Sequence, residues 1–117
     1  MSGGSVVIKC VYEIDYPLGQ KRAYLEWVRS IADVLQAPDE LKRLVSYDNA
    51  FSATPQRVVE FFFDSLQDAG QYFDRKELVP IFQSQLPAHG TNIRITTLVL
   101  RGDYTKDTVQ RTPGGET

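Results

Sequence analysis

The chain has 117 residues, a length that suits one domain with a single hydrophobic core. Hydrophobic residues make up 42% of it, charged residues 24%, and the net charge is −2. These are ordinary globular values, which give no reason to expect nucleic acid or a membrane as a partner. The only cysteine, Cys10, excludes an internal disulfide and favours a reducing compartment, so we expect a cytoplasmic protein.

The first strong secondary-structure signal is a strand from Val6 to Ile14. Even-numbered positions in it are apolar, whereas the other parity includes Lys9 and Glu13. Residues 1–5 before it have no signal-peptide pattern and are predicted to be a flexible lead. No apolar run approaches the roughly 18 residues that a membrane helix needs.

From about Gln20 to Gln36 the apolar period becomes helical. The apolar positions recur at three- and four-residue spacing and form one stripe: Tyr24, Trp27, Val28, Ile31, Val34 and Leu35. A second strand follows near Leu44 to Phe51, and a third runs from Arg57 to Phe63. Because the loop between them is short, these two strands are predicted to form a hairpin.

The second helical region is predicted to be broken into about 65–73 and about 75–86, because Pro80 disfavours one continuous helix. Ser65 is suited to cap its first turn. Asn92 to Arg101 is the fourth predicted strand.

The order β-α-β-β-α-β predicts an α+β protein of the ferredoxin-like, or split βαβ, arrangement. The expected four-stranded antiparallel sheet has the order 4-1-3-2, with both helices on one face. The domain is predicted to span 6–103, preceded by the flexible lead 1–5 and followed by a polar C-terminal tail 104–117.

Three features resemble a known superfamily: the segment YLEWV at 24–28, the segment FDSLQDA at 63–69, and the broken second helix. They look like the dimeric α+β barrel superfamily, which includes antibiotic-biosynthesis monooxygenase-like and EthD-like proteins. The resemblance spans about residues 6 to 103. It implies a homodimer in which two sheets pack face to face across a twofold axis and enclose a ligand cavity.

Glu60 is unusual because it lies within an apolar strand. Strand alternation turns its neighbours toward the helices: Val59, Phe61 and Phe63. Glu60 then shares the open sheet face with Lys9 and Glu13. Strands one and three are adjacent, so Lys9 is an expected ion-pair partner of Glu60, and Arg94 is an alternative.

Two interpretations of these charges stay open. They form either a charge-compensated network that fixes the dimer register, or the polar floor of a ligand cavity. The candidate ligand-binding residues are Lys9, Glu13, Tyr47, Glu60 and Arg94. Because the hairpin register is not fixed by the sequence, it is open which of Tyr47, Asp48 and Asn49 face the interior.

The remaining chemically distinctive residues have plain structural interpretations. His89, the only histidine, is expected at a helix end, where it complements the helix C-terminus. Cys10 and Trp27 are expected to pack in the core. No spacing indicates a metal site, and no cofactor is expected. The haem-degrading branch of the superfamily uses an asparagine, a tryptophan and a histidine that have no counterparts here.

The sequence therefore predicts a small-molecule-binding homodimer whose partners are a second copy of itself and a small aromatic or apolar ligand. The alternative is a cofactor-independent monooxygenase, cyclase or isomerase that acts on an aromatic or polyketide-like substrate. Whether the protein is an enzyme is left open by the sequence.

Overall fold

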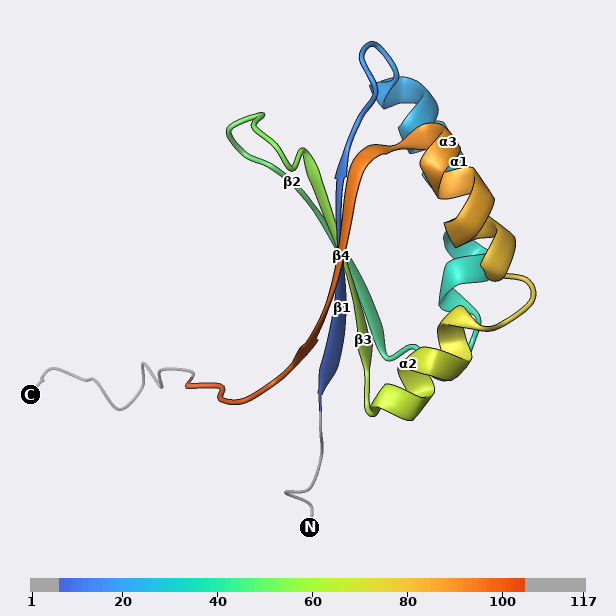
Figure 1. The fold of residues 1–117 in the computed structure, drawn as a ribbon, viewed down its shortest axis with the longest axis vertical. Coiled ribbons are helices and arrows are strands. Elements are labelled where there is room, and N and C mark those ends of the chain that lie inside the picture. Colours follow the sequence, from blue (N-terminus) through green and yellow to red (C-terminus); the bar gives the residue numbers. More distant parts are fainter. Residues whose placement is uncertain (1–6, 105–117) are drawn as a thin grey trace, which may run out of the picture.

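The computed structural model describes residues 7–104, which form one antiparallel sheet with every helix on the same side of it (Figure 1). The elements are β1 (Ile8–Asp15), α1 (Lys21–Gln36), β2 (Arg43–Asp48), β3 (Arg57–Phe63), α2 (Leu66–Phe73), the π-helical η2 (Ile81–Gln85), α3 (Leu86–His89) and β4 (Thr91–Val99). The strand order is β2-β3-β1-β4, which is the predicted order 4-1-3-2. The predicted ferredoxin-like α+β arrangement is thus confirmed. The predicted lead 1–5 and tail residues 105–117 lie outside the described residues.

Alternation along the strands gives the sheet two different faces. On β1 the helix-facing side chains are buried, as predicted: Ile8, Cys10, Tyr12 and Ile14. On β3 the helix-facing Phe61 and Phe63 lie opposite residues of this β1 set. The intervening residues face the other side of the sheet, called the open face below, which no helix covers within residues 7–104 (Figure 1).

The second strand ends at Asp48 rather than near residue 51 as predicted. The side chain of Asn49 causes this early end, because its Oδ1 accepts a hydrogen bond from Phe51 N at 2.9 Å. The Asn49 carbonyl also accepts one from Ser52 N at 3.1 Å. Such a turn competes with strand pairing, so the hairpin loop begins three residues earlier than the composition indicates.

The second helical region is broken as predicted. Ser65 Oγ caps α2 by accepting a hydrogen bond from Asp68 N at 3.0 Å. The chain becomes helical again at residues 79–89, later than the predicted range 75–86. Pro80 lies in the first turn of this segment, where its missing N–H costs no intrahelical hydrogen bond.

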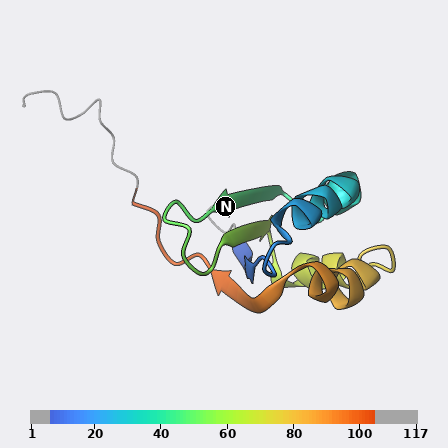
Figure 2. The same ribbon diagram turned by 90° about the horizontal axis from the view of Figure 1, so that it is seen from above.

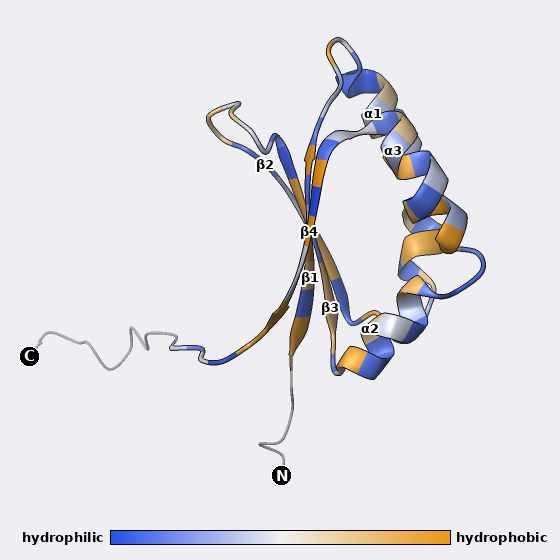
Figure 3. Cartoon of the chain, viewed as in Figure 1, coloured by the Kyte–Doolittle hydropathy of each residue, from blue (hydrophilic) through white to orange (hydrophobic). Residues whose placement is uncertain are grey.

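Figure 2 shows the helices as a layer beside the sheet. The hydrophobic core lies between these two layers and is rich in aromatic rings. Phe61, Phe73 and Phe82 contact one another at centroid distances of 5.1–5.7 Å. The Tyr72 side chain is fully buried, and its hydroxyl donates a 2.6 Å hydrogen bond to the Leu35 carbonyl near the end of α1. The helices turn their apolar residues toward this layer and their polar residues toward solvent (Figure 3).

The side chain of Asp15, at the end of β1, connects the sheet to the hairpin loop and to the start of β4 through hydrogen bonds. The residue is only 7% exposed. Its Oδ2 accepts hydrogen bonds from Thr54 Oγ1 at 2.6 Å and Asn92 Nδ2 at 3.0 Å, and its Oδ1 accepts one from Gln56 N at 2.9 Å. These bonds from Thr54, Asn92 and Gln56 lower the pKa of the Asp15 carboxyl, against the opposing effect of burial.

Among the helices of residues 7–104, none is long and apolar enough to cross a lipid bilayer.

Candidate functional site

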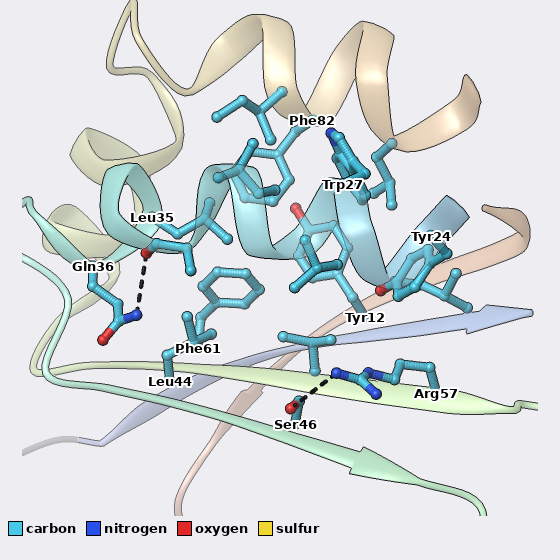
Figure 4. A pocket seen from close by; sticks show the side chains of 17 residues that line it. Tyr12, Tyr24, Trp27, Leu35, Gln36, Leu44, Ser46, Arg57, Phe61 and Phe82 are labelled. Atoms are coloured by element: carbon cyan, nitrogen blue, oxygen red, sulfur yellow. Dashed lines mark hydrogen bonds between the residues drawn. The ribbon is translucent and has the colours of Figure 1, made fainter. Parts of the chain in front are cut away.

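A cavity of about 260 Å³ lies between the helices and the helix-facing side of the sheet (Figure 4). Its walls come from β1, α1, β2, β3, η2 and α3, and most of its lining side chains are aliphatic or aromatic: Tyr12, Ile14, Tyr24, Trp27, Val28, Ile31, Leu35, Leu44, Val59, Phe61, Ile81, Phe82 and Leu86. Ala32, Gln36, Ser46 and Arg57 complete the lining. A cavity with apolar walls and few polar groups is typical of a small-molecule site.

The cavity meets solvent at the β2 edge of the sheet. Gln36 of α1 and Ser46 of β2 are exposed lining residues. Leu44, between them in the lining, is only partly buried. The cavity therefore opens between α1 and the edge strand β2.

Trp27 forms the wall on the side of α3, and its position is fixed by its neighbours. Its Nε1 donates a 2.8 Å hydrogen bond to Gln85 Oε1. The His89 imidazole stacks on the indole at 4.9 Å between centroids, and the Tyr24 ring contacts the indole edge-on at 5.7 Å. His89 does end a helix as predicted, but it also supports a cavity wall.

Arg57 is the only cationic residue of the cavity lining in the described part of the chain. Its Nη1 donates a 2.9 Å hydrogen bond to Asp48 Oδ1, and its Nη2 makes a long contact of 3.4 Å with Ser46 Oγ. The Nε atom is buried and has no acceptor within residues 7–104. The guanidinium also lies 5.9 Å from the centroid of the Tyr24 ring (Figure 4).

Tyr24 adds a hydroxyl group to this polar end, whereas the Tyr12 hydroxyl points toward the helices, away from Arg57 (Figure 4). Both tyrosines line the cavity, and neither hydroxyl has a hydrogen-bond partner among the residues that the structure describes. Burial raises the pKa of Tyr24 to about 12, although nearby Arg57 opposes the shift. Burial likewise raises the pKa of Tyr12. Both hydroxyls are therefore protonated at neutral pH and available as hydrogen-bond donors.

The residues predicted as ligand-binding lie together on the open face, on the opposite side of the sheet from the cavity. Lys9 Nζ and Glu60 Oε2 form the expected ion pair at 3.3 Å. Arg94 does not reach Glu60; it lies on β4 directly opposite Glu13 of β1. Tyr47 lies opposite Val58, and so also belongs to the open face.

The hairpin register separates the three residues that the sequence could not place. Asp48 lies opposite Arg57 at the end of β2 and accepts hydrogen bonds from the Arg57 guanidinium and the Tyr16 hydroxyl. These two donors lower the pKa of the Asp48 carboxyl. Asn49 forms the turn described above. Only Tyr47 faces the side of the sheet where the other predicted residues lie.

The open face combines charge with apolar surface. Phe62 lies between two cations, with Lys9 Nζ at 5.9 Å and Arg43 Cζ at 5.4 Å from its ring centroid. The apolar residues that share this face are Val11, Val45, Val58 and Leu98. A hollow beside Phe62 extends toward the C-terminal end of β4.

Cys10 is the remaining residue with nucleophilic chemistry in this domain. Its side chain is buried, as predicted, and contacts Thr97 Oγ1 at 3.6 Å. Burial raises the pKa of its thiol, which opposes thiolate formation. Within residues 7–104, no group of three or more histidine, cysteine, aspartate or glutamate side chains is placed to hold a metal ion.

The sequence matches no family model and no curated protein. It is similar in structure to a dimeric ferredoxin-like protein of unknown function from Thermobifida fusca, with a TM-score of 0.68, 14% identity, and coverage of 83% of this chain and 93% of that one. It is also similar to an antibiotic biosynthesis monooxygenase-like protein from Deinococcus radiodurans, with a TM-score of 0.67, 13% identity, and coverage of 86% of this chain and 97% of that one. For a DABB family protein with a ferredoxin-like fold from Mesorhizobium loti, the TM-score is 0.63, the identity is 11%, and the coverage is 84% of this chain and 99% of that one.

These likenesses confirm the predicted ferredoxin-like fold, since the chain matches these solved structures over nearly their whole length. At such low identity they establish the fold alone, and the function rests on the chain's own residues.

Sequence reasoning misses the cavity and its polar end. It assigns Trp27 to core packing and treats Arg57 only as the start of a strand. A signal for Arg57 is present, because it shares the parity of Val59 and Phe61 on β3. A cation on the helix-facing side of a strand needs a nearby polar or anionic partner.

Proposed function

We propose that this protein binds a small, mainly apolar molecule in the cavity between the helices and the sheet. The observation that carries this proposal is the cavity itself, about 260 Å³ with aromatic and aliphatic walls. Protein interiors are normally packed with few voids larger than a water molecule. A space of this size with an opening at the β2 edge is therefore better suited to a ligand than to the core of a purely structural domain.

Trp27 provides a direct assay, because it is the only tryptophan of the chain and lines the cavity. Titration with octan-1-ol, a neutral apolar probe that does not absorb light at the wavelengths of tryptophan fluorescence, is expected to change the fluorescence of Trp27 in a saturable way. Ala32→Leu should occupy part of the cavity and weaken binding by about tenfold or more. Ala88→Leu, at an exposed position of α3, is the matched control.

The result that contradicts this proposal is specific. If octan-1-ol and related apolar probes leave Trp27 fluorescence and calorimetric heats unchanged, the cavity is not a binding site. Equal binding to the Ala32→Leu and Ala88→Leu variants would place the probe elsewhere on the protein.

We also infer that the open face is the contact surface of a homodimer. Its apolar residues surround Phe62, and its charges include both signs, so one copy of the face is complementary to another. A twofold contact requires this self-complementarity. A dimeric protein of the same fold, from Thermobifida fusca, supports the inference. Sedimentation equilibrium should give about twice the chain mass of 13.2 kDa, whereas a monomer at micromolar concentration would overturn it.

In this dimer we propose that the four charged residues among the predicted ones, Lys9, Glu13, Glu60 and Arg94, fix the register of the two sheets. Lys9 and Glu60 already compensate each other within one protomer. Glu13 and Arg94 lie opposite each other with opposite charges. Burial against a second copy therefore leaves the charges of Lys9 and Glu60 paired, which favours the network interpretation over a ligand floor.

A cofactor-independent monooxygenase, cyclase or isomerase acting on an aromatic or polyketide-like substrate is the second candidate. The observation that favours it is the Tyr24 hydroxyl, which lies in the cavity beside the Arg57 guanidinium and has no hydrogen-bond partner among residues 7–104. Fixed hydrogen-bond donors stabilise a developing oxyanion such as an enolate. The test is exchange of the α-protons of an aryl ketone in deuterated buffer, measured by NMR. A rate equal to that of buffer alone, or of Tyr24→Phe, removes this candidate.

A further inference from the structure

The polar end of the cavity has hydrogen-bond donors that residues 7–104 do not satisfy. On the Nε–Nη2 edge of the Arg57 guanidinium, Nε is buried without an acceptor, and Nη2 makes only a 3.4 Å contact with Ser46 Oγ. This edge is the fork that pairs with a carboxylate through two parallel hydrogen bonds. The ion pair with Asp48 uses Nη1, a different atom.

The buried Nε has a thermodynamic consequence. An N–H group that is removed from water and left unpaired destabilises the empty protein. A ligand that brings an acceptor to Arg57 would remove this cost, whereas a purely apolar ligand would leave it. The empty site therefore favours ligands that carry an acceptor at this end.

The neighbouring tyrosine has the same preference. The Tyr24 hydroxyl is a protonated donor without a hydrogen-bond partner among residues 7–104, and its ring lies 5.9 Å from the Arg57 guanidinium (Figure 4). Tyr24 and Arg57 thus offer donors from α1 and β3 at one end of an otherwise apolar space. A head group that only accepts hydrogen bonds satisfies both, and a negative charge complements the guanidinium.

The charge of Asp48 does not cancel this preference. Its side chain is 58% exposed, whereas that of Arg57 is only 14% exposed. Water and salt therefore screen the aspartate on the outer side. The inner, desolvated edge of the guanidinium keeps its attraction for an anion.

On these grounds we propose that the ligand of the cavity is an amphipathic carboxylate, with its apolar body against Trp27 and its carboxylate on the Nε–Nη2 edge of Arg57. This rests on the proposed ligand-binding function and adds the chemical class of the ligand. Tyr24, whose ring lies beside the guanidinium, donates its hydroxyl hydrogen bond to the same head group.

Three probes that share one alkyl chain test this on the wild-type protein: octanoate, octan-1-ol and octylammonium. Binding is measured at neutral pH by calorimetry and by Trp27 fluorescence. Octanoate is expected to bind about tenfold more tightly than octan-1-ol, and octylammonium more weakly than either. If octan-1-ol binds and octanoate binds no better, the proposed ligand class is wrong while the binding function stands. If none of the three binds, the binding function itself fails.

Variants then locate the head group. Arg57→Met keeps the apolar stem and is expected to weaken octanoate about tenfold while changing octan-1-ol less than about twofold. Arg57→Lys keeps the charge without the fork and should recover only part of the loss. Arg29→Met, on the exposed side of α1, is the matched control and should bind like wild type.

If the Arg57→Met variant binds octan-1-ol with nearly the affinity of the wild-type protein, the cavity of the variant is intact. Unchanged octanoate affinity in a folded Arg57→Met protein overturns the assignment to Arg57. If Arg57→Met does not fold, the comparison of the three probes on wild type and a Tyr24→Phe variant decides, since the latter should weaken octanoate more than octan-1-ol.

Discussion

Replacement of Asp15 by asparagine is the perturbation with the most direct structural consequence. The change is nearly isosteric, but it exchanges one carboxylate oxygen for an NH₂ group. Oδ2 of Asp15 accepts from both Thr54 Oγ1 and Asn92 Nδ2. With a donor in that place, the Asn92 amide faces another donor, and the Thr54 hydroxyl must reverse its role.

The magnitude follows from those bonds. A hydrogen bond to a charged group contributes about 1.5–3 kcal/mol, and a buried donor left without an acceptor costs about 1–3 kcal/mol. Asparagine keeps the bond from Gln56 N and part of that from Thr54. We therefore expect Asp15→Asn to lower the free energy of unfolding by about 2–3 kcal/mol at neutral pH. For a domain of this size each kcal/mol corresponds to a shift of about 4–8 °C in Tm.

The pH dependence has a definite sign. The three hydrogen bonds hold the pKa of Asp15 below its ordinary value, so the folded protein binds a proton less readily than the unfolded chain. The stabilisation by Asp15 is therefore complete above the unfolded pKa of about 3.9 and is lost as the pH falls through the folded pKa. The asparagine side chain of the variant cannot titrate, so the stability difference between wild type and Asp15→Asn should shrink in acid.

Urea unfolding at matched protein concentration from neutral pH down to the acid limit measures this difference. Asp33→Asn, at an exposed position of α1, is the control and should change stability little. Equal stability of wild type and Asp15→Asn at neutral pH would refute the hydrogen-bond argument. A stability difference that stays constant into acid would refute the inferred lowering of the pKa.

Three further predictions concern assembly and packing. Glu60→Gln should raise the dissociation constant of the proposed dimer about 10- to 30-fold, because the Lys9–Glu60 ion pair is lost from both protomers of a twofold contact. Glu26→Gln, at an exposed position, should leave the dissociation constant measured by sedimentation equilibrium unchanged. Tyr72→Phe should cost about 1–2 kcal/mol in chemical unfolding, since a buried carbonyl of α1 loses its donor; no loss would mean that water replaces the hydroxyl. Gly70→Ala, with open space around the added carbon, should stabilise α2 by about 0.5–1 kcal/mol. Gly90→Ala should instead destabilise by about 1–3 kcal/mol, because the added carbon would lie 2.6 Å from a methyl group of β1, and equal melting temperatures for the two glycine variants would contradict this packing.

The fold and the faces of the strands can be predicted because they depend on local periodicity. Alternation alone assigns Glu60 to the open face, and the strand order names Lys9 as its partner. Both follow from a period of two and from the adjacency of strands one and three.

The cavity cannot be predicted in the same way. Its size depends on how closely Trp27, Phe82 and Phe61 approach one another, and these residues lie on three separate elements. Periodicity indicates which side of an element is buried, but not whether the buried side chains fill the space between them. The position of Tyr47 is likewise undetermined by the sequence, because an asparagine turn rather than the visible proline loop ends β2.

Strand β3 forms part of both surfaces, because its residues alternate between them. Arg57, Val59 and Phe61 line the cavity, whereas the even-numbered residues of the strand, Val58, Glu60 and Phe62, lie on the open face. In a saturation mutagenesis library of this strand, the phenotype should therefore change at every step along the chain. Substitutions at odd-numbered positions would change binding of the proposed ligand, and those at even-numbered positions would change formation of the proposed dimer. An inserted or deleted residue would exchange the two faces of the strand and would therefore impair both ligand binding and dimer formation.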